Sequence, residues 1–510
     1  MKLADLVAAL SGAQPAGAAL PYDEVVRGVV ADSRQVRPGD LFVAVRGTHV
    51  DGHRFLAEAV ARGALAIVLE AGSEVPDGTP ALTVPNTRVA LAELSAAWYG
   101  RPADRLALVG ITGTIGKTSV LSILDVILAR AGIPAGTIGS LGIRFGDTVH
   151  ATRLTTPDAL TLHRALAQML AGGARLAAME VTSHALVQHR VHGLRFRLGV
   201  FTNLTLLEHL EYHGSFRRYV EAKLRYFDHL EKGAPLVYAA GDRLVQTIVR
   251  DRRGVRPVGC GPGGTVSVRV GRPAPEAGGS RVIFTVRRPL PRLDGGSVAP
   301  GTFTLDLPLL GRPYVRNATL AAAAALCAGA EVEHVQAAVA SMPPPRRRMQ
   351  ILHRGRFTVL DDTVAHPDAI SAVFEVAARL PHRRLHVVYA IRGRRGIEIN
   401  RRDAEAIAIW LRRVPAATVV VTASEEATDA ANWVQAEEED AVLHELRRCV
   451  PGVEYRPRLD DAIGLALGRA GRRDLVLLLG AQGMDGGADV VARWLQRHGE
   501  AVSGERGGGH

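Results

Sequence analysis

Two of the four lysines in this 510-residue chain stand where an ammonium group could do chemistry. The segment from Gly110 to Ser119 reads Gly-Ile-Thr-Gly-Thr-Ile-Gly-Lys-Thr-Ser, between a predicted strand and a predicted helix. In such a loop the glycines let the backbone approach phosphates, Lys117 meets the β- and γ-phosphates, and the Thr118 hydroxyl meets Mg²⁺. An ordinary glycine turn is the alternative, because Gly110 is one residue too far from Gly116 for the usual spacing. We expect a nucleotide site made by Gly113, Thr114, Ile115, Gly116, Lys117, Thr118 and Ser119.

Lysine is scarce in this chain, and its scarcity gives each lysine weight. Lys and Arg together number 62, of which only Lys2, Lys117, Lys223 and Lys232 are lysines. Because arginine is always protonated, a lysine in such a background is expected to do what arginine cannot. A solvated charge on a helix face is the simpler interpretation of Lys223, but three arginines within eight residues would serve that purpose equally.

Glu180 ends a predicted buried strand, where a lone carboxylate is costly unless a cation lies beside it. That cation is either a nearby arginine or a metal ion. A zinc protease site at His209 and His213 is excluded, because the spacing is His-x-Glu-x-His and that site needs His-Glu-x-x-His.

The elements that must position these residues follow an α/β pattern. Residues 1 to about 100 predict a small α/β unit, and buried strands are expected at Leu106 to Ile111, Leu176 to Val181, Leu198 to Asn203 and Leu236 to Ala240, with a helix over Lys117 to Ala131. Strands that alternate with helices indicate a parallel sheet. Residues 255 to 310 alternate as antiparallel strands do. Beyond Pro343 to Pro345, strand and helix patterns predict a second, Rossmann-like domain.

Composition excludes several classes of protein. The net charge is +11, but the basic residues are spread along the chain without aromatic interleaving, so we expect anionic small ligands and no nucleic acid. No apolar stretch is long enough to span a bilayer, and the start of the chain has no signal-peptide pattern. The three cysteines lack metal or disulfide spacing. A cytoplasmic enzyme without a membrane partner is expected.

The phosphate loop resembles that of the Mur ligase family, and the similarity extends over the first two thirds of the chain. The segments that carry it are Asp32-Ser33-Arg34, Pro38 to Ala44, Asp51-Gly52-His53, Thr155-Thr156-Pro157, Met179 to Leu186, Gln188 to Val191, Phe201 to Thr205, His209 to Gly214 and Ala222-Lys223. They are most similar to the MurE branch. The resemblance implies three domains: 1–101 for the UDP-sugar, 102–345 for ATP around a central phosphate-loop sheet, and a Rossmann-like 346–510 for the amino acid, with 503–510 as a flexible tail.

The resemblance also implies roles for individual residues. Metal ligands would be Thr118, Glu180, His209 and Lys223, the last as a carbamate formed with CO₂; Lys117, Lys223, Glu180 and His209 would be the catalytic set. Further ATP contacts would come from Asn317 and Arg348, UDP-sugar and peptide contacts from Ser33, Thr155, Thr156, Thr182, Gln188 and Arg190, and an amino-acid contact from Arg395.

The activity implied is ATP-dependent addition of a free amino acid to UDP-N-acetylmuramoyl-L-alanyl-D-glutamate in peptidoglycan biosynthesis, through an acyl phosphate. ATP, Mg²⁺ and the carbamylated lysine would be the cofactors, and the protein is expected to be a monomer. Two alternatives stay open: a related amide ligase with another acceptor, and a catalytically weakened binding protein.

The last domain departs from the family pattern. Thr422 to Glu426 stands where the family has Asp-Asn-Pro-Arg, a motif that grips the carboxylate of meso-diaminopimelate, so that amino acid is disfavoured. Arg392 to Asn400 replaces Gly-Gly-Asp-Arg-Asp, with only Arg395 on the family arginine. Gly480 to Asp485 replaces Gly-Lys-Gly-His-Glu. The phosphate loop itself carries Ile115 where the family usually has Asn.

Overall fold

A computed structural model describes most of the chain. The described residues are 1–47, 50–152, 154–205, 210–263, 266–271, 274–276, 279–308, 310–342, 346–364, 366–430 and 432–499. They divide into two compact units, described separately below. Unit 1 comprises 1–272, 283–305 and 316–340, and unit 2 comprises 273–282, 306–315 and 341–510. The expected tail, 503–510, and the Pro343 to Pro345 boundary lie outside the described residues.

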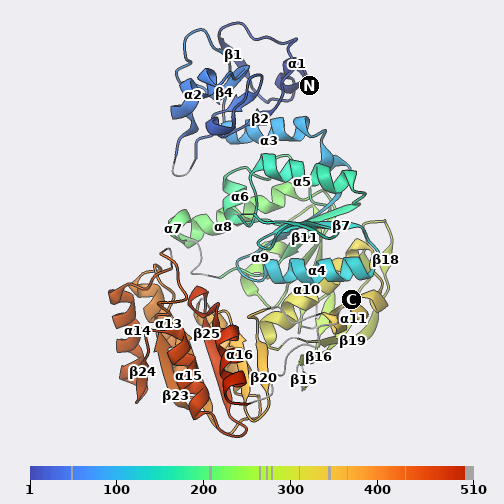
Figure 1. The fold of residues 1–510 in the computed structure, drawn as a ribbon. Helices are drawn as coiled ribbons and strands as arrows, with labels where there is room; N and C mark the ends of the chain where they lie inside the picture. Colours follow the sequence, from blue (N-terminus) through green and yellow to red (C-terminus); the bar gives the residue numbers. More distant parts are fainter. Residues whose placement is uncertain are drawn as a thin grey trace. The chain divides into compact units, whose positions relative to one another are not determined.

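Unit 1 begins with a five-stranded sheet in the order β1-β5-β4-β3-β2 (Figure 1). Its strands are β1 (Gln14–Gly17), β2 (Val29–Val30), β3 (Leu41–Val43), β4 (Ala66–Glu70) and β5 (Pro80–Val84), and its helices are α1 (Leu3–Val7), α2 (Leu56–Ala61) and α3 (Thr87–Trp98). All neighbours pair in parallel except β1 with β5. The apolar runs of the sequence therefore fall on strands, as predicted.

The centre of unit 1 is a larger sheet that contains the run β13-β12-β11-β6-β10-β7-β8-β9. The strands are β6 (Ala107–Thr112), β7 (Ala135–Gly139), β8 (Gly142–Phe145), β9 (Thr148–His150), β10 (Leu176–Glu180), β11 (Leu198–Phe201), β12 (Ala234–Ala239) and β13 (Val255–Gly261). The helices are α4 (Lys117–Arg130), α5 (Ala159–Ala171), α6 (Ser183–Val187), α7 (Leu210–His213), α8 (Phe216–Leu224) and α9 (Arg243–Arg250). β6 lies between β10 and β11 and is parallel to both, so the loop after β6 opens at the carboxyl edge of the sheet.

The predicted antiparallel pairing of residues 255 to 310 is confirmed for part of that range. The remaining strands are β14 (Val268–Val270), β15 (Ala274–Glu276), β16 (Gly279–Val286), β17 (Leu290–Pro291), β18 (Ser297–Val298) and β19 (Gly301–Leu307). β14 with β16, β15 with β16, and β17 with β18 are antiparallel. The prediction is wrong for β13, which is parallel to β12. The cause is α9, because a helical crossover between two strands returns the chain to the same end of the sheet.

Two helices follow: α10 (Arg312–Ala328) and α11 (Val332–Ser341). Alanines 321–325 of α10 are all fully buried, so the alanine-rich run is an interior helix.

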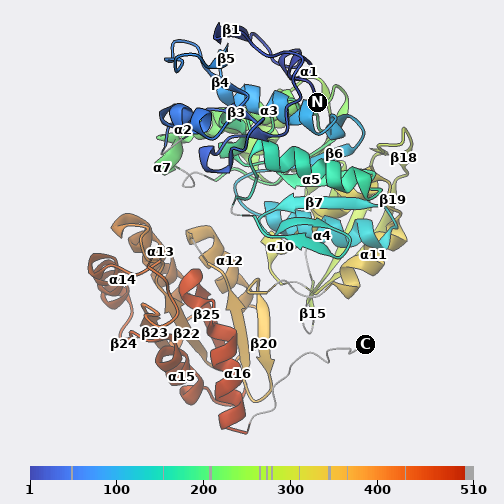
Figure 2. The same ribbon diagram turned by 45° about the horizontal axis from the view of Figure 1, so that its top comes forward.

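Unit 2 contains a six-stranded sheet in the order β20-β21-β25-β22-β23-β24, parallel except for β20 (Figure 2). Its strands are β20 (Gln350–Arg354), β21 (Thr358–Asp362), β22 (Leu385–Ala390), β23 (Ala416–Thr422), β24 (Val453–Tyr455) and β25 (Leu475–Gly480). Its helices are α12 (Pro367–Ala377), α13 (Ile397–Leu411), α14 (Ala436–Cys449), α15 (Leu459–Arg469) and α16 (Gly487–Arg497). α15 and α16 pack on one face and α12, α13 and α14 neighbour one another on the other, which is the predicted Rossmann-like arrangement.

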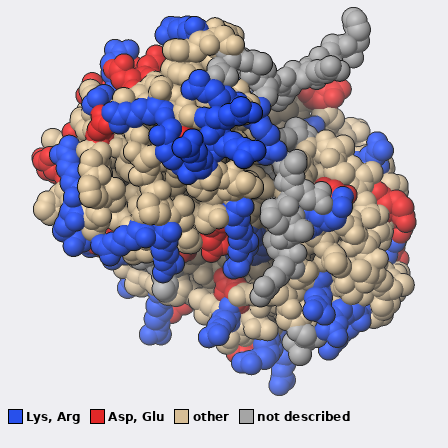
Figure 3. All heavy atoms as spheres, turned by 90° about the horizontal axis from the view of Figure 1, so that it is seen from below, with Lys and Arg blue, Asp and Glu red and all other residues tan. Residues whose placement is uncertain are grey.

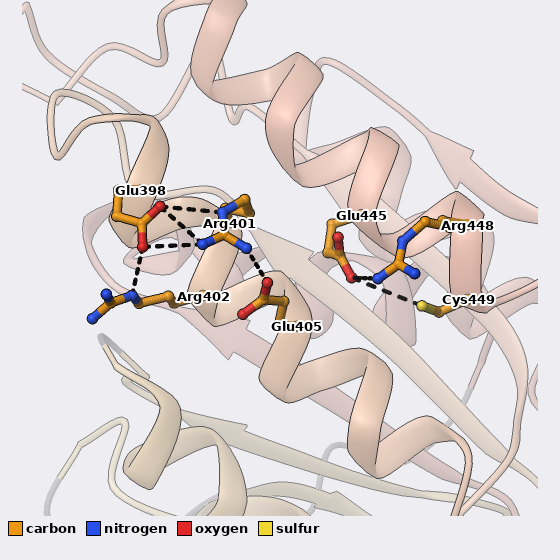
Figure 4. Close-up of polar contacts among 7 residues, drawn as sticks. All are labelled: Glu398, Arg401, Arg402, Glu405, Glu445, Arg448 and Cys449. Carbon is orange, nitrogen blue, oxygen red and sulfur yellow. Dashed lines mark hydrogen bonds and ion pairs between the residues drawn. The ribbon is translucent and has the colours of Figure 1, made fainter.

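The arginine background is partly neutralised within the elements that carry it. Arg and Lys side chains extend over much of the face in Figure 3, with acidic side chains among them. On α13, Glu398 accepts from Arg401 and Arg402, and Arg401 also pairs with Glu405 (Figure 4). Such pairs contribute little stability individually. None of the helices in the described part of the chain is long and apolar enough to cross a membrane.

Candidate functional site

The segment from Gly113 to Gly116 joins β6 to α4 in a turn that only glycine fits at two positions. Gly113 has φ +133°, and a Cβ there would lie 2.1 Å from Thr202 Oγ1. Gly116 has φ +90°, and a Cβ there would lie 2.6 Å from Asn317 Oδ1. The backbone is thus tightly enclosed, and Asn317 of α10 lies beside the loop. The cradle left by the missing side chains at the helix start fits the phosphates of a nucleotide.

The end of β11 and the helix α8 hold this loop in place. Asn203 accepts from the Ile115 amide through Oδ1 at 2.9 Å and donates to the Ile115 carbonyl through Nδ2 at 2.8 Å. The hydroxyls of Thr114 and Tyr219 are 2.8 Å apart. The backbone of the loop is therefore ordered by side chains from distant segments.

Lys117 begins α4 and points its ammonium back over the loop. Its Nζ donates to the carbonyl oxygens of Gly113 at 3.1 Å and Thr114 at 2.9 Å. The charge is thereby held at the point where a phosphate on the loop would lie, as the sequence predicts.

Glu180 is almost fully buried at the end of β10 and accepts only neutral donors among the described contacts. Thr118 Oγ1 lies 3.0 Å from both carboxylate oxygens, and the Ser140 amide donates at 2.8 Å. The arginine salt bridge considered as an alternative is not among its contacts in the described residues. A hydroxyl and a carboxylate are hard oxygen donors, so this pair fits Mg²⁺. Among the described residues, no group of three or more His, Cys, Asp or Glu side chains could hold a metal ion.

Lys223 of α8 is buried, which contradicts the alternative of a solvated charge. Its Nζ donates to Gly113 O at 2.9 Å and to Thr112 Oγ1 at 3.3 Å. Burial lowers the pKa of Lys223 well below its ordinary value; the Lys117 ammonium acts in the same direction, and Glu180 opposes both. Deprotonation is therefore easier for this lysine than for an exposed one.

These groups line one cavity of about 450 Å³. The lining comprises Thr114, Gly116, Lys117, Thr118, Ser140, Leu154, Thr155, Thr156, Glu180, Thr182, Ser183, His184, Arg190 and Lys223. The cavity therefore brings phosphate-loop residues together with four of the residues predicted for the sugar and peptide.

Three of those four residues are linked to one another by hydrogen bonds, and the fourth, Thr155, bonds Ser140. Thr156 Oγ1 donates to the Glu180 carbonyl at 2.9 Å and lies 3.1 Å from Thr182 Oγ1. Arg190 donates to the Thr156 carbonyl at 2.7 Å. Thr155 Oγ1 lies 3.0 Å from Ser140 Oγ. These hydrogen bonds fix the threonines and the guanidinium in the lining of the cavity.

Gln188 orients that guanidinium and does not itself line the cavity. Its Oε1 accepts from Arg190 Nη2 at 2.6 Å and Nε at 3.1 Å, while its Nε2 donates to the Tyr212 hydroxyl at 2.9 Å. Burial lowers the pKa of Arg190.

The other predicted residues lie elsewhere. The Ser33 hydroxyl, in the first sheet, donates to Glu58 at 2.8 Å. In unit 2, Arg348 Nη1 donates to the Thr363 carbonyl at 3.3 Å, and Arg395 is exposed. Ser119 lies in the first turn of α4. His209 lies outside the described residues.

Sequence reasoning assigned no role to several residues that shape the site. Tyr219, Asn203 and Ser140 bond the loop or Glu180, and Tyr226 donates to the Gly110 carbonyl at 2.6 Å. Asn203 had a signal, since it sits in the quoted segment Phe201 to Thr205 at the end of a predicted strand. The two tyrosines and Ser140 had none.

A glycine loop with its lysine, at the carboxyl edge of a parallel sheet and beside a hydroxyl–carboxylate pair, defines a nucleotide-binding α/β protein of the phosphate-loop class. Three family descriptions match the chain: "Mur ligase family, catalytic domain" over residues 25–99, "Mur ligase middle domain" over 111–325 and "Mur ligase, glutamate ligase domain" over 347–482. The chain belongs to the Mur ligase family and is a ligase.

Relatives and solved structures agree with this family. A UDP-N-acetylmuramoyl-L-alanyl-D-glutamate–2,6-diaminopimelate ligase of Geobacter metallireducens is 35% identical over 401 residues, covering 78% of this chain and 75% of the relative. The ligase of the same name from Geobacillus kaustophilus is 33% identical over 458 residues, 88% of each. A solved structure with that ligase name superposes with a TM-score of 0.70 at 20% identity, covering 98% of this chain and 99% of the other. The last likeness shows the three-domain α/β fold alone.

Proposed function

We propose that this chain joins a free amino acid to UDP-N-acetylmuramoyl-L-alanyl-D-glutamate at the expense of ATP. The observation that carries the proposal is the single cavity lined by Lys117, Glu180 and Lys223 together with Thr155, Thr156, Thr182 and Arg190. The names of the relatives support the same substrate class.

The chemistry proceeds in two steps. A carboxylate oxygen of the dipeptide attacks the γ-phosphorus of ATP, the bond to the β-γ bridging oxygen breaks, and ADP leaves. The neutral amine of the amino acid then attacks the acyl carbon, the tetrahedral intermediate expels phosphate, and one proton is released. Because no protein nucleophile is needed, the chain contributes positioning and charge neutralisation.

Lys117 and the Thr118–Glu180 pair supply that neutralisation. The Lys117 ammonium, held over the loop by two carbonyls, meets the charge of the transferring phosphoryl group. Thr118 and Glu180 would hold Mg²⁺, which supplies Lewis-acid stabilisation of phosphate oxygens. Gly113 to Ser119 and Asn317 would bind ATP, with Arg348 of the last domain, and His209 would contribute to a second metal.

Lys223 would carry a carbamate. Carbamylation joins the free amine to CO₂ with release of one proton, so it requires the neutral amine that burial favours here. In an amine near ordinary lysine pKa that form is scarce at neutral pH. The carbamate would place an anion at the end of the Lys223 side chain, where it could orient the metal.

Two substitutions of Lys223 distinguish the loss of its positive charge from the loss of its ability to form a carbamate. Lys223→Ala is expected to abolish turnover and to be partly rescued by short carboxylates, whereas Lys223→Arg keeps a cation and gains no rescue. The exposed Lys232→Ala is the matched control. A carbamate carbon signal in NMR with ¹³C-bicarbonate should be present in the Lys232→Ala protein and lost in both Lys223 variants; its presence in Lys223→Arg would contradict the assignment.

The identity of the added amino acid is the open part of the proposal. The named relatives are diaminopimelate ligases, but the acidic side chains Glu425 and Glu426 follow β23 where the family has a carboxylate-gripping motif, and both are exposed. We propose that the added amino acid is not meso-diaminopimelate and that Arg395 contacts it.

Phosphate release measured with ATP, UDP-N-acetylmuramoyl-dipeptide and a panel of lysine, ornithine, diaminopimelate and other amino acids tests both points. Release that depends on the dipeptide and on one amino acid supports the ligase, and release with diaminopimelate alone would overturn the specificity. No release with any amine would overturn the function.

We further propose that the protein acts in the cytoplasm as a monomer. Ser33 would lie on the uridine side of the UDP-sugar site.

A second candidate is an ATP-dependent amide ligase with another acceptor. The departure of residues 422–426 favours it, because the acceptor site is the part of the chain that differs. Phosphate release that requires the dipeptide and an amine other than an amino acid, and none with any amino acid of the panel, would select it.

A further inference from the structure

A second hollow, of about 760 Å³, lies at the opposite edge of the central sheet from the nucleotide loop. Its lining comes from the segments that lead into β6, β10 and β11, from residues 132–134 before β7, and from residues 292–294 and 328–329. The amino ends of parallel neighbouring strands meet at one edge, and these segments close a space there. Its size is within the usual range of small-molecule sites.

The length of β6 separates the two cavities. Ala107, the first residue of β6, lines the hollow, whereas the phosphate loop begins after Thr112. Six residues of extended strand span roughly 20 Å. A small molecule in the hollow therefore cannot contact the reacting atoms, and none of the hollow's lining residues lines the nucleotide cavity.

Arginine dominates the charge of this hollow. Its lining contains five arginines (Arg105, Arg175, Arg195, Arg197 and Arg292) and three acids (Asp104, Glu231 and Asp294). Two of the arginines are engaged by carboxylates: Arg292 with Glu331 at 2.7 Å and with Asp294, and Arg197 with Glu231 at 3.9 Å. The other three are exposed, and across the described residues no carboxylate forms an ion pair with them. Arg195 Nη1 donates to the Asp228 carbonyl, so the guanidinium groups of Arg105 and Arg175 and the remaining N–H groups of Arg195 are available to an external anion.

One wall of the hollow, formed by residues 292–294 and 328–329, is held by hydrogen bonds. Arg292 Nη2 donates to the Gly329 carbonyl at 2.8 Å, Arg197 Nη2 donates to the Leu293 carbonyl at 3.1 Å, and the Leu293 amide donates to Cys327 O at 2.8 Å. Because both segments of the wall are tied to each other and to the start of β11, the hollow is formed before any ligand binds.

We propose that this hollow binds a small phosphorylated molecule with a hydroxylated body. Guanidinium groups suit phosphate oxygens because they donate in a planar, bidentate fork. The carboxylates of Asp104, Glu231 and Asp294 can accept from sugar hydroxyls, and Leu106, Ile133 and Leu293 offer apolar surface to the rest of the body. A free phosphate would use only the arginines, so the acids select for a sugar phosphate.

Calorimetric titration in a Lys117→Ala background tests the site, since that variant removes the lysine of the nucleotide loop. Ribose 5-phosphate and inorganic pyrophosphate are the probes. Ribose 5-phosphate should bind more tightly than pyrophosphate. The triple variant Arg105→Ala/Arg175→Ala/Arg195→Ala should bind ribose 5-phosphate at least about tenfold more weakly. Tighter binding of pyrophosphate would overturn the hydroxylated body, and no binding of either probe would overturn the site.

A matched control removes the same charge elsewhere in unit 1. Arg243, Arg250 and Arg253 are exposed and outside the hollow. Replacing these three with alanine should leave both affinities within about twofold. An equal loss in the control variant would show that net charge, and not the hollow, governs binding, and would overturn the proposal.

Chemical footprinting supplies a readout that does not depend on a folded triple variant. Phenylglyoxal modifies accessible arginines, and mass spectrometry of peptides reports each one. Ribose 5-phosphate should protect Arg105, Arg175 and Arg195 in the unsubstituted protein while leaving Arg243 and Arg250 unprotected. Modification of the three at unchanged rates would overturn the proposal.

Discussion

Two helices of this protein begin after a glycine with a similar positive φ, and the charged groups that meet the two turns differ. Gly116 precedes α4 with φ +90°, and Gly396 precedes α13 with φ +88°. Before α13, the amides of Arg394, Arg395 and Gly396 all donate to Glu438, at 2.6 to 2.9 Å. Before α4, a lysine ammonium stands over the loop. One helix start is closed by the protein's own carboxylate, and the other is arranged for an external anion.

A strand–glycine–helix turn therefore does not by itself identify a ligand site. The two turns differ in ψ, −3° at Gly116 and 157° at Gly396, and in the charge of the side chain that meets them. Arg395 was predicted to bind the amino acid, and its amide is already used by Glu438, so only its exposed side chain could do so.

The largest expected effect is at Lys117. Lys117→Ala should lower ATP-dependent turnover by on the order of 10²–10³-fold or more, because the developing charge loses its cation. Phosphate release measures it, and circular dichroism should show an unchanged fold. The exposed Lys232→Ala is the control. If the turnover of Lys117→Ala stays within tenfold of that of the unsubstituted protein, the turn before α4 does not serve an external anion, like the turn before α13.

Replacing each of the two glycines with alanine distinguishes the effect of a clash with neighbouring atoms from the cost of a positive φ. Gly116→Ala would bring a Cβ to 2.6 Å from Asn317 Oδ1, whereas nothing lies within 4 Å of a Cβ at Gly396. We expect Gly116→Ala to weaken ATP binding by roughly 10- to 100-fold. Gly396→Ala should leave ATP binding unchanged and cost about 1 kcal/mol of stability, from the positive φ alone. Equal losses of ATP affinity would contradict the distinction.

Glu438 is expected to be a stability residue. Glu438→Ala leaves the amides of Arg394, Arg395, Gly396 and Gln435 without this acceptor, so the free energy of unfolding should fall by about 2–4 kcal/mol. Urea denaturation measures it. The exposed neighbour Glu437→Ala should change stability by less than about 0.5 kcal/mol. Unchanged stability in Glu438→Ala would show that the second turn does not need its carboxylate.

The smallest effect expected is a pH dependence at Asp474, a second internal carboxylate of unit 2. Burial alone would raise its pKa, but the Gly471 amide, His386 and Arg384 outweigh burial and lower the pKa to about 2. A depressed pKa gives stability that is present above the ordinary value of 3.8 and is lost as the pH falls toward 2. Asp474→Asn should remove about 1–2 kcal/mol at pH 7 and less at pH 3, after allowance for solvent screening. The exposed Asp440→Asn should show no such difference in urea titrations; a pH-independent loss in Asp474→Asn would contradict the assignment.

Sequence reasoning predicted the local features of the site well. The loop, the helix that begins at Lys117 and the buried strand that ends at Glu180 are written in contiguous residues, and the structure has all three. Their patterns are local, because glycine punctuation and apolar runs act over a few positions.

The rest depends on contacts between distant segments. Tyr219 and Thr114 are 105 positions apart, Asn203 and Ile115 are 88 apart, and Glu438 lies more than 40 positions from the amides that it accepts. No spacing rule relates such pairs. The parallel direction of β13 was likewise missed, because it follows from the crossover before the strand and not from the strand's own alternation.

The carboxamide of Asn203 occupies both hydrogen-bonding groups of the Ile115 peptide, as one rung of a neighbouring strand would. One side chain thus bonds the loop as a neighbouring strand would, and the Thr202 hydroxyl adds a second donor to the Ile115 carbonyl at 2.7 Å. The loop then enters nucleotide binding with little conformational entropy left to lose. The side chain at position 115 takes no part in this support, so the support does not depend on the isoleucine.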